Sequence, residues 1–371
     1  MATTTLDAPE AEVAKKEKMA VIDCDIHNVD GYESPATEVW RAYMPEEWQD
    51  YHYNFGGRRR GGNGCPRAVA YAARNDAFPP EGEGPPGSYL PLMQEQLLDE
   101  WEMDYGVLNP LSPAGTQQNL PYAAAIAQAV NEWQIAEWLD KDLRLRASLT
   151  VAYEEPDFAV AEIERLGNHP GFVQLMFMAR TMEPLGRRKY WKIYEAAQAY
   201  NLPIGVHFGG TGVGPITGAG KPAHYLQDHG GMPMAFQAQV ASFVYEGVFE
   251  QFPDLQVVLI EGGFGWVPPL MWRMDSRYKQ LKAEVPYLKR LPSEYIRDHF
   301  WLTTQPVEEP PNPEYFHEML DHMDMNHKLM FATDYPHWDF DAPDQAYPRG
   351  LDENVRRGFL AENARTLYGL D

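Results

Sequence analysis

The stretch VIDCDIH, Val21 to His27, decides the fold of this chain. Its apolar residues predict a buried strand, yet Asp23, Asp25 and His27 stand at alternate positions within it. Successive side chains of a strand point to opposite faces, so the spacing predicts that all three ionisable groups share one face. Because burying unpaired charge is costly, such a face predicts a bound cation.

Seven further apolar runs follow this one and alternate with stretches of helical spacing. The expected strands span residues 19–26, 105–110, 146–153, 171–177, 202–208, 255–261, 299–304 and 328–334. The expected helices cover residues 121–140, 157–166, 190–200, 234–252, 268–285, 314–323 and 353–370. Eight strands alternating with helices predict an α/β fold, a (β/α)8 TIM-like barrel. An open doubly wound sheet would give similar local patterns, so the count leaves closure open.

The expected barrel has a long insertion after its first strand, at about residues 31–100, where connections of about 2–6 residues are usual. We expect residues 1–19 to form a flexible N-terminal tail, and residues 20–371 to form a single domain in which the insertion is a lid or an interface. Arg58, Arg59 and Arg60 lie in this insertion. They form either a solvated loop or a clamp for a substrate carboxylate.

Composition excludes several classes of partner. The formal net charge of −23 argues against nucleic acid and anionic membranes. Two cysteines, Cys24 and Cys65, make no disulfide framework, which favours a reducing cytoplasm. There is no apolar run of transmembrane length, and the N-terminus lacks the apolar core of a secretory signal. The 10 Trp and 21 Tyr favour a homo- or hetero-oligomer, since aromatic residues are enriched at interfaces.

Ionisable residues collect where the expected strands end, which is where active sites of such barrels lie. Four strands deliver them, and the residues are Asp25, His27, His207, Glu261, Asp334 and His337. Carboxylate and imidazole are preferred ligands of zinc, iron and manganese. We therefore predict a divalent metal held by Asp25, His27, His207 and Asp334. Glu261 and His337 are open between direct ligation and support of a ligand.

Other candidates are weaker. Asp23, deeper on the first strand, is expected to fix a ligand imidazole. His224 and His229 lie in a Gly-rich loop, and His299 comes too early in its strand. The loop stretch GGTGVGPITGAG lacks the Lys-Ser/Thr of a phosphate loop, and no GxGxxG follows a strand in the required context, so no nicotinamide or flavin is expected.

Four motifs, DCDIH, GVHFGG, LIEGGFGW and FATDYPHWD, resemble the amidohydrolase superfamily, in particular the amidohydrolase-related branch that contains ACMS decarboxylase and γ-resorcylate decarboxylase. The resemblance runs from about residue 21 to residue 370 and implies metal ligands at Asp25, His27, His207 and Asp334. Two departures stand out. The first motif reads Asp-x-His where His-x-His or Glu-x-His is common in the branch. Glu261 stands where the decarboxylases place a catalytic histidine, and a glutamate does not simply replace an imidazole near neutral pH.

The Asp-x-His start, the Glu-Gly-Gly strand end and the DYPHWD motif are similar to a small group of the superfamily, the dinuclear non-haem monooxygenases such as 2-aminoisobutyrate hydroxylase. This similarity implies an iron or manganese oxygenase, or a subunit of one. Glu261 and His337 would recruit a second metal ion and serve as catalytic residues. The substrate would be a small carboxylate or amino acid, with Arg180 and Arg58 as candidate contacts; a surface salt bridge is an equal interpretation for Arg180.

Two alternatives stay open. The first is a mononuclear zinc or manganese decarboxylase or hydrolase that acts on a small aromatic carboxylic acid, with Glu261 or Asp334 as base. In such a site the metal lowers the pKa of its bound water to about 7. The second is a non-catalytic metal-binding subunit that supports an active paralogue.

Overall fold

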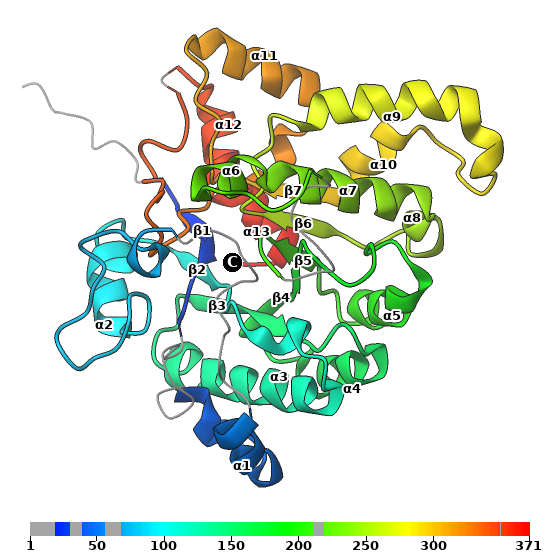
Figure 1. Ribbon diagram of the computed structural model, residues 1–371. Coiled ribbons are helices and arrows are strands. Elements are labelled where there is room, and N and C mark those ends of the chain that lie inside the picture. The colour runs from blue at the N-terminus through cyan, green and yellow to red at the C-terminus, as the bar shows by residue number, and fades with distance from the viewer. Residues whose placement is uncertain (1–18, 30–38, 56–67, 211–218, 349) are drawn as a thin grey trace, which may run out of the picture.

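The computed structural model describes residues 19–29, 39–55, 68–210, 219–348 and 350–371. Within them, eight strands form one parallel sheet in the order β1 to β8, with helices around the outside (Figure 1). The strands are β1 Ile22–Ile26, β2 Tyr105–Leu108, β3 Leu145–Thr150, β4 Phe172–Met178, β5 Ile204–His207, β6 Val257–Ile260, β7 Phe300–Thr303 and β8 Leu329–Met330. The predicted barrel, with its long insertion between β1 and β2, is confirmed.

The barrel closes between its last strand and its first. Regular pairing with β7 ends at Met330, because β7 itself ends at Thr303. Beyond that point the chain bonds to β1 instead. The amide of Cys24 donates to the carbonyl of Phe331 at 2.9 Å, and the amide of Asp334 donates to the carbonyl of Asp25 at 3.0 Å. The carboxyl ends of β1 and β8, which carry predicted site residues, are thereby fixed side by side.

Most of the predicted helices are confirmed. The longer helices are α1 Glu46–Phe55, α3 Leu120–Gln134, α4 Pro156–Leu166, α5 Trp191–Ala199, α7 Met232–Tyr245, α9 Val267–Leu281, α10 Pro292–His299 and α11 Pro313–Met323. The shorter ones are α2 Leu90–Met93, α6 Tyr225–Gly230, α8 Val248–Gln251, α12 Glu353–Arg357 and α13 Asn363–Tyr368. The single helix predicted over residues 234–252 is wrong. It breaks into α7 and α8 at Gly247, which has a φ of 77° that ends a right-handed helix. Helix α10 was not predicted.

Two apolar clusters hold the barrel together. The larger lies between the sheet and the outer helices, where Ile126, Ile163 and Phe243 are fully buried with Leu149 and Phe177 of the strands. Each such side chain contributes about 1.5–3 kcal/mol on burial. The smaller includes Val258, Trp301 and Met330 with Ala361 and Ala364 of the C-terminal segment. Helix α13 and the C-terminus accordingly lie at the middle of the ring in Figure 1.

The insertion reaches the carboxyl end of the barrel. Its η1 turn, Val39–Tyr43, packs against α3. Ala73 pairs with His337 in an antiparallel bridge, and the amide of Trp338 donates to the carbonyl of Ala72 at 2.8 Å. This part of the insertion therefore borders the predicted site. The predicted tail lies almost entirely, and the predicted Arg58–Arg60 spot wholly, outside the described residues.

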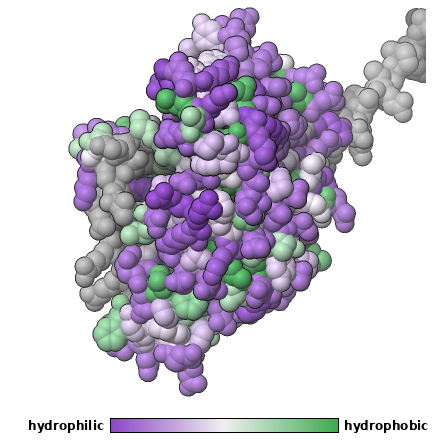
Figure 2. Space-filling model, turned by 90° about the vertical axis from the view of Figure 1, so that its right-hand side faces the viewer, coloured by the Kyte–Doolittle hydropathy of each residue, from purple (hydrophilic) through white to green (hydrophobic). Residues whose placement is uncertain are grey.

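The surface matches the acidic, polar composition. The face seen in Figure 2 is mostly hydrophilic, with apolar side chains scattered over it. Among the helices of the described chain, none is both long and apolar enough to cross a membrane.

Candidate metal centre

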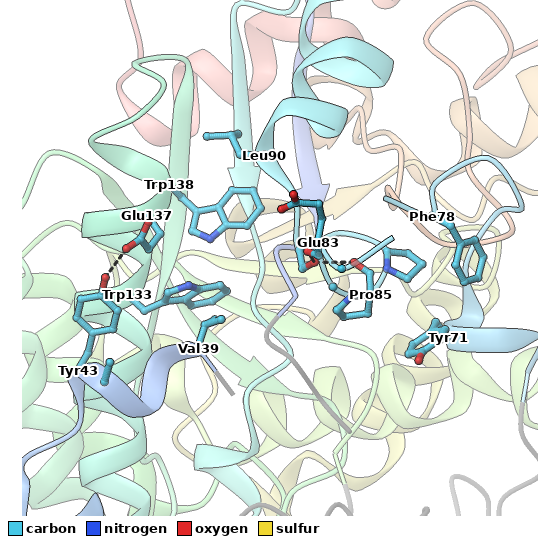
Figure 3. A pocket seen from close by; sticks show the side chains of 15 residues that line it. Val39, Tyr43, Tyr71, Phe78, Glu83, Pro85, Leu90, Trp133, Glu137 and Trp138 are labelled. Atoms are coloured by element: carbon cyan, nitrogen blue, oxygen red, sulfur yellow. Dashed lines mark hydrogen bonds between the residues drawn. The ribbon is translucent and has the colours of Figure 1, made fainter. Parts of the chain in front are cut away.

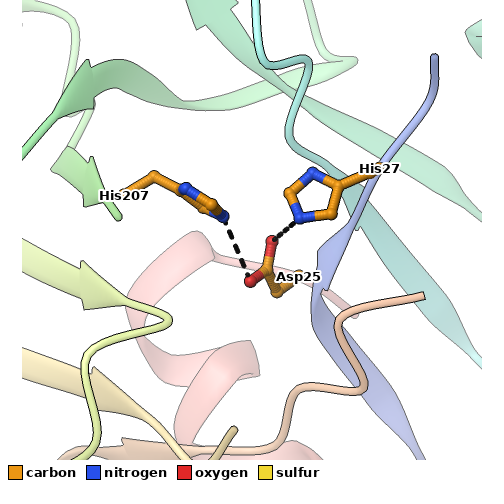
Figure 4. A group of neighbouring side chains, drawn as sticks. All are labelled: Asp25, His27 and His207. Carbon is orange, nitrogen blue, oxygen red and sulfur yellow. Dashed lines mark ion pairs between the residues drawn. The ribbon is translucent and has the colours of Figure 1, made fainter. Parts of the chain in front are cut away.

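Three side chains from β1 and β5 converge at the carboxyl end of the barrel (Figure 4). Nε2 of His207 lies 3.4 Å from Oδ2 of Asp25, and Nε2 of His27 lies 3.6 Å from Oδ1 of the same carboxylate. All three side chains are at most 1% exposed. Two imidazoles and one carboxylate facing one point form a ligand set that suits a divalent metal.

A second group shares His27 with the first. Nε2 of His27 lies 2.8 Å from Oδ1 of Asp334, and Nδ1 of His337 lies 2.7 Å from the same oxygen. Oε2 of Glu261 lies 3.3 Å from Nε2 of His207. The structure thus brings all six predicted residues together from β1, β5, β6 and β8. That they bind metal stays a prediction.

Hydrogen bonds set the direction of the imidazole lone pairs. Nδ1 of His27 donates to the carbonyl of Asn109 at 2.7 Å, and Nδ1 of His207 donates to the carbonyl of Phe208 at 2.6 Å. Each Nδ1 therefore carries the proton, and in the neutral ring each Nε2 presents a lone pair. In the described chain, Nε2 of His207 and Oδ2 of Asp25 have no hydrogen-bond partner although both are buried. Two buried acceptors that face each other fit a cation between them.

Burial and charge move the pKa values in opposite directions around the site. Burial lowers the pKa of His27, but Asp25 and Asp334 outweigh it and raise that pKa to about 9. Burial alone would raise the pKa of Asp334, yet contacts with His337 and His27 hold it well below its usual range. Burial, then the charges of Asp334 and Asp25, raise the pKa of Glu261 well above its usual value. These opposed shifts show a concentration of negative charge that a metal ion would offset.

Two of the acidic residues have unusual backbone conformations. Glu261 has a φ of 60° and Asp334 a φ of 61°, in the left-handed region that non-glycine residues rarely adopt. Each such residue costs about 1–3 kcal/mol and clusters at functional sites in proteins. With these conformations, the carboxylate of Glu261 faces His207, and that of Asp334 faces His27 and His337.

Asp23 was expected to share a face with Asp25 and His27 and to fix a ligand imidazole. Both expectations are wrong. Asp23 pairs with Gly106 and Ile26 pairs with Leu108, so a bulge adds one residue to β1 between these pairs. Asp23 therefore lies on the side of Ile26, opposite Asp25 and His27. Its carboxylate accepts the amides of Thr333 and Asp25, each at 3.0 Å, and within the described residues it contacts no imidazole. Asp23 ties β1 to the end of β8, and burial raises its pKa to about 7.

Several polar neighbours of the site were missed. Nδ2 of Asn109, just after β2, donates to Oδ1 of Asp25 at 2.9 Å. Nε2 of Gln305, after β7, donates to Oδ2 of Asp334 at 3.3 Å. Both follow expected strands, so the same strand-end rule that found the ligands could have found them. Sequence gave no sign that Glu308 would accept the amides of Phe264 and Gly265 in the loop after Glu261.

The remaining candidates belong to neither of the two ligand groups. Arg180 follows β4, and its amide donates to the carbonyl of Gly209 beside the end of β5. His299 donates from Nδ1 to the carbonyl of Leu255 and stacks on Phe249, which is a structural role. His229 pairs with Asp339 at 2.9 Å. Arg58 lies outside the described residues.

A separate cavity of about 990 Å³ opens between the insertion and α3 (Figure 3). Trp133 and Trp138 line it, and the hydroxyl of Tyr43 donates to Glu137 in its wall. None of its lining residues is one of the six site residues. The candidate metal centre and this cavity therefore have no lining residue in common.

Known proteins resemble this chain over most of its length. A γ-resorcylate decarboxylase from Rhizobium sp. (strain MTP-10005) is 24% identical over 318 residues, covering 77% of this chain and 92% of that protein. A dihydroxybenzoic acid decarboxylase from Polaromonas sp. JS666, with bound manganese, superposes with a TM-score of 0.66 at 17% identity, over 95% of this chain and 97% of that one. The 5-carboxyvanillate decarboxylase from Sphingomonas paucimobilis superposes with a TM-score of 0.67 at 18% identity, over 95% and 100%.

At this level of identity, the structural similarities show that the fold is shared. None of these relatives supports the similarity to the monooxygenase group. The sequence matches the family model described as Amidohydrolase over residues 22–370, from β1 to the C-terminal helix. The resemblance seen in the four sequence motifs is thereby confirmed at the level of the family. The chain belongs to the amidohydrolase family.

Proposed function

We propose that the chain is a metal-dependent decarboxylase of a small aromatic carboxylic acid. The observation that carries this proposal is the buried cluster of carboxylates and imidazoles at the carboxyl end of the barrel. Relatives and structural neighbours named as decarboxylases of hydroxylated benzoates support it. Mixed oxygen and nitrogen ligands suit manganese or zinc, and a bound divalent cation would polarise substrate oxygens as a Lewis acid.

The proposed reaction exchanges a carboxyl group for a proton. The bond between the ring carbon and the carboxyl carbon breaks, carbon dioxide leaves, and the electron pair stays on the ring carbon, which accepts a proton. Glu261 is the residue placed to carry that proton. Its carboxyl group lies beside the ligand set, 3.3 Å from His207, and is 7% exposed as a residue. This burial excludes bulk water from the proton transfer.

Arg180 is our candidate for binding the substrate carboxylate. Its backbone is fixed beside the end of β5, and its guanidinium carbon lies 6.0 Å from the ring centroid of Phe208, the residue after His207. Nε of Arg180 is buried and has no hydrogen-bond partner in the described chain. A carboxylate would satisfy this donor, since guanidinium matches carboxylate geometry. Arg58, the second candidate contact, stays a proposal without structural support.

One observation favours a second candidate function. Glu261 stands where a histidine is expected, and its Oε2, 3.3 Å from Nε2 of His207, adds a further carboxylate beside the candidate ligands. Two iron or manganese ions would supply oxygen activation for a monooxygenase acting on a small carboxylate or amino acid such as 2-aminoisobutyrate. One oxygen atom would enter a C–H bond, and the other would leave as water, with two electrons from an external reductant and two protons from solvent. Glu261 and His337 would hold the second ion.

Metal content and oxygen dependence separate the two candidates. Protein produced with manganese, zinc and iron supplied would be analysed for metal per chain, then incubated with hydroxybenzoates without oxygen. We expect a single ion per chain and release of carbon dioxide with a matching decarboxylated product. Two ions per chain with substrate-dependent oxygen uptake, and no carbon dioxide, would replace the decarboxylase with the oxygenase.

A further inference from the structure

A row of polar side chains crosses the barrel beneath the metal centre. Asn109 follows β2, Ser148 lies in β3 and Gln174 lies in β4, and all three are 0% exposed. Ser148 and Gln174 are paired in the parallel ladder. Barrel interiors are mostly filled by branched apolar side chains, and buried polar groups are costly unless hydrogen-bonded. A polar row in this place therefore needs complete pairing.

The row is a directed chain of hydrogen bonds that begins at the C-terminal helix. The hydroxyl of Tyr368, the last residue of α13, donates to Oε1 of Gln174 at 2.8 Å. Nε2 of Gln174 donates to Oγ of Ser148 at 2.9 Å. Oγ of Ser148 donates to Oδ1 of Asn109 at 2.5 Å, and Nδ2 of Asn109 donates to Oδ1 of Asp25 at 2.9 Å. Every donor points towards the metal centre.

This chain fixes the orientation of the Asn109 amide. Its Oδ1 also accepts from Gln174 at 3.3 Å, and its Nδ2 also donates to the carbonyl of Cys24 at 3.1 Å. A flipped amide would lose all of these bonds. The backbone carbonyl of Asn109 accepts from Nδ1 of His27 at 2.7 Å. Asn109 therefore sets the His27 tautomer and occupies one oxygen of Asp25, which leaves Oδ2 of Asp25 and Nε2 of His27 for a cation.

We propose that Tyr368, Gln174, Ser148 and Asn109 are positioning residues that couple docking of the C-terminal helix to metal affinity. Packing around Gln174 supports this, because a Cβ on Gly205 of β5 would lie 3.0 Å from Cδ of Gln174 and 2.8 Å from the carbonyl of Leu175. The neighbouring strand is shaped to admit the glutamine. The inference rests on the proposed metal site and is independent of which reaction the metal serves.

Metal titration of the metal-free full-length enzyme tests the coupling. Affinity for Mn²⁺ would be measured by calorimetry, and the visible spectrum of Co²⁺ would report ligand geometry. Asn109→Ala should weaken binding by about 10- to 100-fold, as loss of a ligand's hydrogen-bond partner does. Tyr368→Phe, three hydrogen bonds further from Asp25 than Asn109, should weaken Mn²⁺ binding by about 2- to 30-fold. Both should shift the Co²⁺ spectrum.

Tyr194→Phe is the matched control. Its hydroxyl is also buried and donates to the carbonyl of Leu185, but it lies on α5, outside the sheet. The two tyrosine variants should lose similar thermal stability, while only Tyr368→Phe changes metal affinity and the spectrum. Should Asn109→Ala fail to fold, Ser148→Ala tests the same link and should weaken Mn²⁺ binding.

Unchanged affinity and spectrum in Tyr368→Phe would overturn the coupling, as would an equal loss in Tyr194→Phe. An effect confined to Asn109→Ala would also overturn it, because the role would then end at Asn109. Wild-type enzyme that binds neither Mn²⁺ nor Co²⁺ would refute the proposed metal site itself, which is a different failure visible before any variant is made.

Discussion

Two carboxylates flank the same nitrogen of His207, and they are held in different ways. Oδ2 of Asp25 lies 3.4 Å from Nε2 on one side, and Oε2 of Glu261 lies 3.3 Å from it on the other. The second oxygen of Asp25 is bonded to Asn109. Among the described residues, the carboxyl group of Glu261 makes its polar side-chain contact with His207. One oxygen of Asp25 is held by the side-chain amide of Asn109, whereas the described residues give Glu261 no such bond.

The backbones beneath the two acids differ as well. The carbonyl of Asp25 accepts the amide of Asp334, inside the seam that closes the barrel. Glu261 has a positive φ after β6, and its amide donates to the hydroxyl of Thr303. In the loop that follows, the amide of Phe264 donates to the carboxylate of Glu308. The difference supports our proposal that the β1 side holds the cation and that Glu261, on the β6 side, acts on the substrate.

Replacing Asp25 should have the largest effect. Asp25→Asn keeps the shape but places an uncharged amide where a metal ligand is expected, next to the Asn109 donor. Bound metal should fall below a tenth of the wild-type content, and activity should fall by more than about 100-fold, beyond the loss caused by supporting partners. Mass spectrometric metal analysis of the purified protein measures it.

Asp157→Asn is the control, because that carboxylate is 72% exposed in an ion pair with Lys192. It should retain full metal content and activity. An Asp25→Asn protein that keeps its metal would show that the β1 side is not the anchor, and the comparison between the two acids would fail.

Glu261→Gln should separate reaction from binding. The side chain keeps its size and loses its exchangeable proton, so metal content should stay at the wild-type level while kcat falls by about 10²- to 10⁴-fold, the usual contribution of a positioned acid or base. Turnover and metal content would be measured on the same sample. Loss of one of two bound ions, instead of loss of turnover alone, would assign Glu261 to a second metal ion and favour the oxygenase.

The alternation of strands and helices and the six candidate ligands could be predicted because both follow from local patterns, whereas closure of the barrel was left open. Eight apolar runs alternate with helical stretches, and each can be recognised without knowing its neighbour. Once the barrel is assumed, the strand-end rule places Asp25, His207, Glu261 and Asp334 on one rim without any knowledge of contacts. The structure confirms this convergence although the residues come from opposite ends of the chain.

Features that depend on register could not be predicted. A single extra residue in β1 moves Asp23 to the other face, and nothing in VIDCDIH marks the bulge. In the sequence, Ser148 and Gln174 are polar residues within apolar strands and nothing more. Their pairing with each other, and the bond of Gln174 to Tyr368, 194 residues later, exist only in three dimensions. The contact between Glu308 and the loop after Glu261 likewise forms only in the folded chain.

Glu308→Gln should have an intermediate effect on the Glu261 side. The carboxylate accepts the amide of Phe264 at 3.0 Å and that of Gly265 at 2.7 Å. A glutamine would turn a donor towards these amides or lose one of the bonds. The free energy of unfolding should fall by about 1–3 kcal/mol, and kcat should fall with metal content unchanged. The neighbouring Glu309→Gln, at an exposed position, should change neither. Loss of metal in Glu308→Gln would show that the loop supports the ligands instead.

The smallest expected effect is on the pH dependence of folding stability, measured on metal-free protein. Burial, followed by the charges of Asp334, Asp25 and Asp339, raises the pKa of Glu261 well above its usual value. The folded state therefore binds this proton more tightly than the unfolded chain, so the group favours folding at low pH. That contribution is lost as the pH rises from the ordinary glutamate pKa through the raised one.

Glu261→Gln cannot ionise and should avoid this loss. Urea unfolding of the two metal-free proteins should therefore give similar stabilities in acid and a growing advantage of the variant as the pH rises. A difference that stays constant with pH would contradict the expectation. Saturating metal should shrink the difference, because a nearby cation stabilises the ionised carboxylate. Asp25 and Glu261 would then differ in how they are held, while both respond to the same charge.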